Sequence, residues 1–229
     1  MTLDDYRDQF KKNMMIMSRT ANGKLDLSAS ATKIDSMAAD SADNAKKLAL
    51  SNTDRAISFL YDNRRRKFKS AEELEKLILE TAEITNEGIV KKGCLFRSGE
   101  DSTKFKYSKI KDIPAIWERF IDILYLLLIS NYFEAEEIAA FCEYVINITG
   151  HFFSDGCGKI SMLVSKYVFM RFDKQCPEYR SREDYYRAAE RDTILTAGDL
   201  YRLMSDTKYW NFVSYYLLYV LAGKTPSTM

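Results

Sequence analysis

Histidine, proline and glycine are scarce in this chain. Among its 229 residues are one His, three Pro and nine Gly. Few Pro and Gly residues leave few forced helix breaks, and most apolar residues recur at helical rather than alternating spacing. The sequence therefore predicts an all-α fold, and it offers a single imidazole, that of His151, for acid–base chemistry.

An excess of one charge, paired cysteines and long apolar runs are also missing. With 34 basic and 33 acidic residues the net charge is +1, so no global field attracts nucleic acid or a membrane surface. The longest apolar run, Ile123 to Ile129, is far shorter than the ~20 residues that span a bilayer. The chain starts without the apolar segment of a secretion signal. Its four cysteines form no CxxC pair, which indicates reduced thiols. We expect a cytoplasmic protein without nucleic-acid or membrane partners.

Apolar and aromatic residues are plentiful, with 46% hydrophobic residues, 15 Tyr and 13 Phe. This length and composition predict one compact unit. Its parts are an N-terminal helical region (1–60), a core (61–195) and a C-terminal helical extension (196–229). Helices are expected after a capping-box pattern at Ser70 to Glu73, over Glu134 to Gly150, over Ile160 to Phe172 and over Trp210 to Leu221. Phe96 to Tyr107 differs, because aromatic residues flank a polar tip there, as in a β-hairpin.

The residues best suited to catalysis or ligand binding lie in the run from His151 to Lys159. It reads His-Phe-Phe-Ser-Asp-Gly-Cys-Gly-Lys and lies where one predicted helix ends and the next begins. Glycines at such a turn let backbone N–H groups converge on an anion at a helix N-terminus. The pattern indicates a phosphate-handling site.

Each group in this run has a candidate role. His151 is the candidate base, because a neutral imidazole accepts a proton near neutral pH. Asp155 is a candidate ligand for Mg²⁺ and also a candidate helix N-cap. The N–H groups of Gly156, Cys157 and Gly158 would bind phosphate, while Phe153 points inward and anchors the loop.

A P-loop is excluded, although Gly158-Lys159 superficially looks like the end of one. The GxxxxGK[ST] pattern needs Gly at the position of Phe153 and Ser or Thr at Ile160. It also needs a preceding strand, whereas the residues before His151 have helical periodicity.

The run resembles the active-site motif of the Fic family, His-x-Phe-x-Asp/Glu-Gly-Asn-Gly-Arg-x-x-Arg. His151, Phe153, Asp155, Gly156 and Gly158 match it. Cys157, Lys159 and Met162 depart from it. Three flanking segments are also similar to the family: Gly93 to Arg97, Ile113-Pro114 with the helix that follows, and Pro177 to Arg180 with Asp184 to Tyr186. The resemblance covers roughly residues 28 to 190.

The resemblance implies a helical domain with one short β-hairpin flap. It implies transfer of AMP from ATP, or from another nucleotide donor, with Mg²⁺, to a Ser, Thr or Tyr hydroxyl of a target protein. Lys159 would contact the phosphates. Residues of the flap would hold the target by strand addition, and they are Lys104, Phe105, Lys106 and Tyr107. The alternative interpretation of the flap is a plain surface hairpin without a binding role. Tyr185 and Tyr186 are candidates for stacking on the nucleotide base. The sequence leaves open whether the protein forms a homo-oligomer.

The departures from the motif bear on activity. The thiol of Cys157 is a weak donor, Lys159 lacks the bidentate fork of Arg, and Met162 carries no charge. They predict weaker triphosphate binding, another diphosphate-containing donor such as one for phosphocholine or uridylyl transfer, or a silent Fic-like module that binds nucleotide or peptide without turnover.

Residues of about 28–40 are similar to a degenerate form of the family's inhibitory helix. There Asp35 replaces the inhibitory Glu, whose usual Arg partner is replaced by Met162. The resemblance implies that the usual Glu–Arg lock cannot form. A plain amphipathic helix is the alternative interpretation.

Overall fold

A computed structural model describes residues 1–17, 42–99, 107–130, 132–189, 196–203, 209–210, 213–214 and 216–222. Its α-helices are α1 (Leu3–Met17), α2 (Ala42–Asp62), α3 (Ala71–Asn86), α4 (Ile113–Ser130), α5 (Ala135–Glu143), α6 (Cys157–Arg171), α7 (Arg182–Ala189) and α8 (Ala197–Leu203). The described residues also form a 3-10 turn, η2 (Ile110–Asp112), and two π-helices, η3 (Tyr144–Gly150) and η4 (Tyr216–Val220). The strands β1 (Glu178–Tyr179) and β2 (Leu221–Ala222) pair antiparallel.

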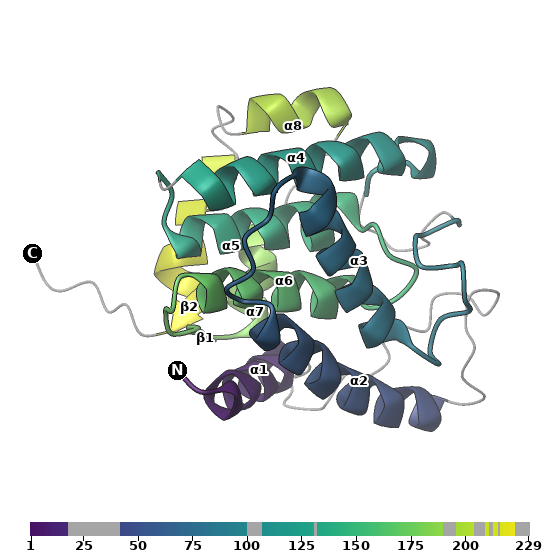
Figure 1. Cartoon of the computed structure of the whole chain (residues 1–229), viewed down its shortest axis with the longest axis vertical. Helices are drawn as coiled ribbons and strands as arrows, with labels where there is room; N and C mark the ends of the chain where they lie inside the picture. Colours follow the sequence, from purple (N-terminus) through teal and green to yellow (C-terminus); the bar gives the residue numbers. More distant parts are fainter. Residues whose placement is uncertain are drawn as a thin grey trace, which may run out of the picture.

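Helix α6 lies at the centre of the fold. In Figure 1, α4, α5 and α6 form three roughly parallel rows, with α8 outside α4 and with α1 and α2 beyond α6. Helix α3 crosses the rows and contacts both α4 and α6. Every residue from Ile160 to Met170 is buried. A helix buried all round belongs in a core rather than on a surface, so its first residue, Cys157, starts inside the protein.

The helix predicted after Ser70 to Glu73 and the helix predicted over Ile160 to Phe172 are confirmed, with differences at their ends. Helix α3 buries the predicted stripe, which includes Leu74, Leu77 and Ile78. Ser70 is its N-cap, yet its hydroxyl makes no capping bond; instead the Lys69 N–H donates to the Glu73 carboxylate at 3.1 Å. The capping-box prediction was therefore wrong in its hydrogen bonds, although it placed the helix start.

The stretch from Glu134 to Gly150 is not one α-helix as predicted. It changes at Tyr144 from α5 to the π-helix η3, and the Thr149 hydroxyl donates to the Tyr144 carbonyl, five residues earlier, at 3.0 Å. A π-helix places side chains differently from an α-helix and is frequent at functional sites. Here it ends at His151.

The C-terminal segment also departs from the predicted continuous helix. Its last described residues form η4 and then β2, which pairs with β1 more than 40 positions earlier. Behind this pairing the buried Glu143 carboxylate accepts hydrogen bonds from the Tyr179 and Tyr216 hydroxyls. Buried charges need such partners, so Glu143 ties the C-terminal segment to α5.

Buried thiols near this cluster predict alkaline sensitivity. Burial raises the pKa of the Cys176 thiol to about 12, from 9.0 in an unfolded chain. The unfolded chain therefore releases this proton first as pH rises, and folding stability is lost between pH 9 and about 12. We expect the free energy of unfolding, measured in urea, to fall over this range. The decrease of this free energy with pH should be smaller in the Cys176→Ala variant. An equal decrease in both proteins would contradict the raised pKa of the Cys176 thiol.

Within the part of the chain that the structure describes, every helix is too short or too polar to span a membrane.

Candidate functional site

His151 lies at the junction of η3 and the loop 151–156, called the motif loop below. Its backbone is left-handed, with φ of 46°, which is uncommon for a residue with a side chain. The half-buried imidazole stacks on the Tyr107 ring, with centroids 4.1 Å apart, and its Nδ1 lies 3.4 Å from the Asn147 carbonyl oxygen. The ring is thus fixed on one side without being sealed in the core.

The chain before the predicted flap tip holds the motif loop by backbone pairing. Phe96 and Phe153 form an antiparallel bridge. The Arg97 N–H donates to the Phe152 carbonyl at 2.8 Å, and the Ser154 N–H donates to the Leu95 carbonyl at 2.9 Å. Residues 95–97, called the flap base because they precede the predicted flap tip, therefore pair with the motif loop. The sequence did not predict this contact.

Arg97 and Ser108 extend this connection. The buried Arg97 donates from Nε to the His151 carbonyl at 3.1 Å and from its guanidinium to the Ser108 carbonyl. The Ser108 N–H donates to the Thr149 carbonyl at 3.0 Å. The described residues before and after the predicted flap tip are in this way bonded to the residues on either side of His151.

The turn into α6 has the predicted backbone form. Gly156 is the N-cap of α6 with φ of 74°, and its carbonyl accepts from the Ile160 N–H at 2.8 Å. The first N–H groups of an α-helix have no intrahelical acceptor and, with the helix dipole, favour an anion. Helix α6 thus presents its N-terminal amides at the motif loop, as phosphate binding requires.

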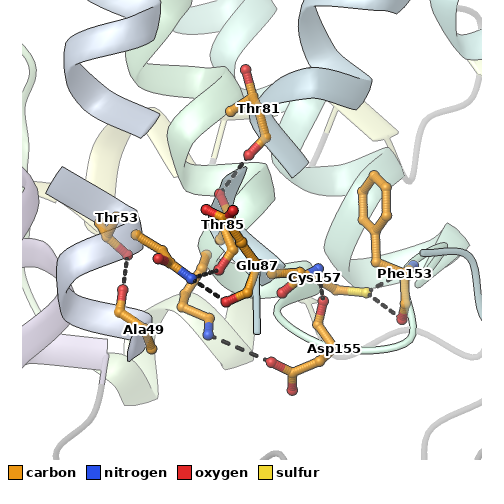
Figure 2. Close-up of polar contacts among 11 residues, drawn as sticks. Ala49, Thr53, Thr81, Thr85, Glu87, Phe153, Asp155 and Cys157 are labelled. Carbon is orange, nitrogen blue, oxygen red and sulfur yellow. Dashed lines mark hydrogen bonds and ion pairs between the residues drawn. The ribbon is translucent and has the colours of Figure 1, made fainter. Parts of the chain in front are cut away.

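Asp155 and Lys159 form an ion pair at this helix start. Lys159 Nζ lies 3.5 Å from Asp155 Oδ2, and both side chains are largely buried. Asn86, the last residue of α3, donates from Nδ2 to the Asp155 carbonyl at 3.2 Å. Figure 2 shows Asp155 beside Glu87 and Thr85, the residues on either side of Asn86. The C-terminal end of α3 therefore positions the predicted metal ligand.

Asn86 is a site residue that sequence analysis missed, because nothing near it in the sequence indicates the contact. Its Oδ1 is buried and has no hydrogen-bond partner among the described residues. A β carbon on Gly156 would lie 3.3 Å from this oxygen and 3.6 Å from Lys159 Nζ. Mg²⁺ is usually held by one or two carboxylates together with waters and substrate phosphates, so Asp155 suits that ion, and the Asn86 amide oxygen is a ligand type that it accepts. In the described residues no group of three acidic, His or Cys side chains could hold a metal.

The Cys157 side chain turns back onto the motif loop. Its buried Sγ accepts from the Phe153 N–H at 3.2 Å and approaches the Phe153 carbonyl at 3.3 Å (Figure 2). The thiol therefore closes the motif loop. Met162 is buried in the core and offers no charge at the site.

Tyr185 does not fit the predicted stacking role. It is buried against Tyr179, and its hydroxyl accepts from Asn147 Nδ2 at 3.2 Å. A ring enclosed in this way presents no face to a base. The side chain of Tyr186 lies outside the described residues.

The other predicted site residues are placed only in part. Tyr107 lies on the imidazole, as given above. Lys104, Phe105, Lys106 and Asp35 lie outside the described residues, so their assignments stay predictions.

Comparison with known proteins identifies the architecture. No protein-family model matches the sequence, and no curated protein matches it. Among solved structures, a Fic domain containing signaling protein from Bacteroides thetaiotaomicron VPI-5482 superposes with a TM-score of 0.60. The match covers 93% of this chain and 83% of that chain at 18% sequence identity. The chain has a Fic-like fold. The fold prediction is therefore confirmed, although the division into three regions stays a prediction.

Two glycines of this Fic-like fold allow a matched prediction. Gly93 and Gly156 both have positive φ, but a β carbon on Gly93 meets nothing within 4 Å, whereas one on Gly156 would lie 3.1 Å from Lys159 Cε. We expect Gly93→Ala to lower the free energy of unfolding in urea by about 1–2 kcal/mol through backbone strain alone. Gly156→Ala should cost more. Equal costs would show that the motif loop is not crowded at Gly156.

Proposed function

We propose that the chain is a Fic-like protein adenylyltransferase that moves AMP from ATP to a hydroxyl of a target protein. One observation supports this most: a half-buried imidazole lies within five residues of the N-terminus of a buried helix, with a carboxylate between them. That arrangement combines a base, an anion site and a cation ligand, which a hydroxyl needs to attack a nucleotide phosphate.

The roles follow from the contacts described above. The target hydroxyl oxygen would bond to the α-phosphorus of ATP as the bond to the leaving diphosphate breaks, and His151 would take the hydroxyl proton. The amides of Gly156, Cys157 and Gly158 would hold phosphate oxygens, and Lys159 would add positive charge. Asp155, with Asn86 beside it, would hold Mg²⁺, which neutralises phosphate charge when bound.

The ion pair between Lys159 and Asp155 sets a condition for this function. Each group now satisfies the other, so the ammonium has to leave the carboxylate before Asp155 can bind a cation. Because Lys159 is long and unbranched, its ammonium can reach a phosphate while the backbone of α6 stays in place. Nucleotide and cation would therefore enter together.

A silent binding module is the second candidate. The side chains that differ from the Fic motif are turned away from the site or already paired: the Cys157 thiol bonds to the motif loop, Met162 is in the core, and Lys159 holds Asp155. The family's phosphate contacts from these three positions would then be weakened, while the fold and the peptide surface remain.

Labelled donors separate the two candidates. The protein is incubated with a cell lysate, Mg²⁺ and α-labelled ATP, and in parallel with UTP or CDP-choline carrying the transferable label. Label on a protein from ATP, lost with the His151→Ala variant and with chelator, supports adenylyl transfer. Label from UTP or CDP-choline, and none from ATP, would show that the protein uses a donor other than ATP. No label from any donor, with nucleotide binding absent in calorimetry, would leave the binding module.

A further inference from the structure

A pocket of about 720 Å³ lies between the start of α3, the turn η2 and the first half of α4. Its apolar wall includes Phe96, Trp117 and Ile121, and its carboxylates are Glu72, Glu75, Glu118 and Asp122. Ligand pockets of this size are usually apolar with a few charged groups. We call this pocket the acidic groove.

The charge of the acidic groove is strongly one-sided. Among the residues that the structure describes, Arg97 is the only basic one that lines it, and its guanidinium already donates to the His151 and Ser108 carbonyls. Glu75 accepts from the Trp117 indole N–H at 2.8 Å, which fixes both side chains. Asp122 pairs with Arg119 at 3.6 Å, whereas Glu72 and Glu118 are exposed at the groove. These two carboxylates beside an apolar wall complement a Lys or Arg side chain, whose charge they attract while its aliphatic stem packs on the wall.

The acidic groove shares one segment with the motif loop. Phe96, Arg97 and Ser98 line the groove, and the first two also bond to the motif loop around His151. The Phe96 ring packs edge-on against Trp117 at 5.3 Å and stacks on Phe153 at 5.5 Å. A ligand in the groove therefore lies next to the segment that leads into the flap.

We propose that the acidic groove binds a Lys- or Arg-bearing segment of the target protein, close in sequence to the hydroxyl that receives the nucleotide. This rests on the proposed function, since it names the class of target for that site. Nucleic acid is a poor occupant, because its phosphates would face four carboxylates. The groove thus selects targets with a basic residue near the modified position.

Trp117 allows the test in the full chain. The chain has two Trp residues, so in a Trp210→Phe background Trp117 is the remaining fluorophore. Acetylated Gly-Ser-Arg-Ser-Gly and Gly-Ser-Glu-Ser-Gly peptides are titrated at low and at high salt. We expect saturable quenching by the Arg peptide, weakened by salt, and no saturation with the Glu peptide.

Paired variants connect the signal to the groove. Glu72→Gln with Glu118→Gln should weaken Arg-peptide binding about 3–10-fold, since exposed ion pairs contribute a fraction of a kcal/mol each. Glu80→Gln, on α3 but outside the lining, should leave it unchanged. Equal binding of both peptides, or binding that ignores the Glu72 and Glu118 changes, would overturn the proposal.

Other occupants and the proposed function itself give separate outcomes. Quenching that depends on protein concentration without peptide indicates a second copy in the groove and overturns the proposal. Tighter peptide binding by a variant with both Lys104→Ser and Lys106→Ser would also overturn the proposal. It would indicate that the chain's own segment competes with the peptide for the acidic groove. If the His151→Ala variant binds the Arg peptide and wild type transfers no label, the transferase proposal fails and the groove remains a peptide site. Transfer without peptide binding would remove the groove proposal alone.

Discussion

The His151→Ala variant is expected to transfer label from ATP about 10²–10⁴-fold more slowly than wild type. A positioned base contributes a factor of this size to proton transfer, and the sequence contains no second histidine to replace it. The stacked Tyr107 ring and the Asn147 carbonyl already orient the imidazole, so the substitution removes the proposed base and not a flexible surface group. The measurement is the initial rate of labelling at saturating ATP, with nucleotide affinity determined separately.

A second substitution separates chemistry from backbone conformation. His151 adopts a left-handed conformation, which Asn tolerates better than Ala. His151→Asn should therefore unfold at nearly the wild-type urea concentration and still be inactive. If it restored labelling while His151→Ala did not, the role of His151 would be structural, and the base assignment would have to be abandoned.

The helical part of the fold was predictable from the spacing of apolar residues. The stripe of α3 and the start of the central helix near Ile160 follow from local periodicity, because a helix is defined by contacts between near neighbours. The change from α5 to η3 was not predictable in the same way, since a π-helix and an α-helix carry nearly the same apolar pattern over seven residues.

The candidate site, too, was predictable only where it depends on residues close together in the sequence. The roles proposed for His151, Asp155 and the glycines came from their spacing within nine residues. The contributions of Asn86 and Arg97 depend on contacts across 69 and 54 positions, and no short-range pattern encodes them. The pairing of β1 with β2 was missed for the same reason. Sequence spacing thus located the motif, whereas its supports came from elements that only the tertiary fold brings together.

Phe153→Ala is expected to lower the free energy of unfolding by about 3–5 kcal/mol, the usual cost of truncating a buried aromatic residue. The ring is buried, stacks on Phe96 and packs edge-on against Trp117 at 5.6 Å. These contacts join the motif loop to the flap base and to α4, so the cavity left by alanine would be bordered by three separate elements. Urea unfolding followed by circular dichroism gives the measurement.

The loss at Phe153 should exceed that of an exposed aromatic residue by a wide margin. Tyr132 is 90% exposed, and Tyr132→Ala should change the free energy of unfolding by no more than about 0.5 kcal/mol. Because the Phe153 ring holds the motif loop against Phe96 and Trp117, we further expect Phe153→Ala to reduce nucleotide affinity under conditions where the protein remains folded. A variant that lost stability but bound nucleotide as wild type does would show that the motif loop keeps its shape without this ring, and that backbone pairing alone positions the amides of α6.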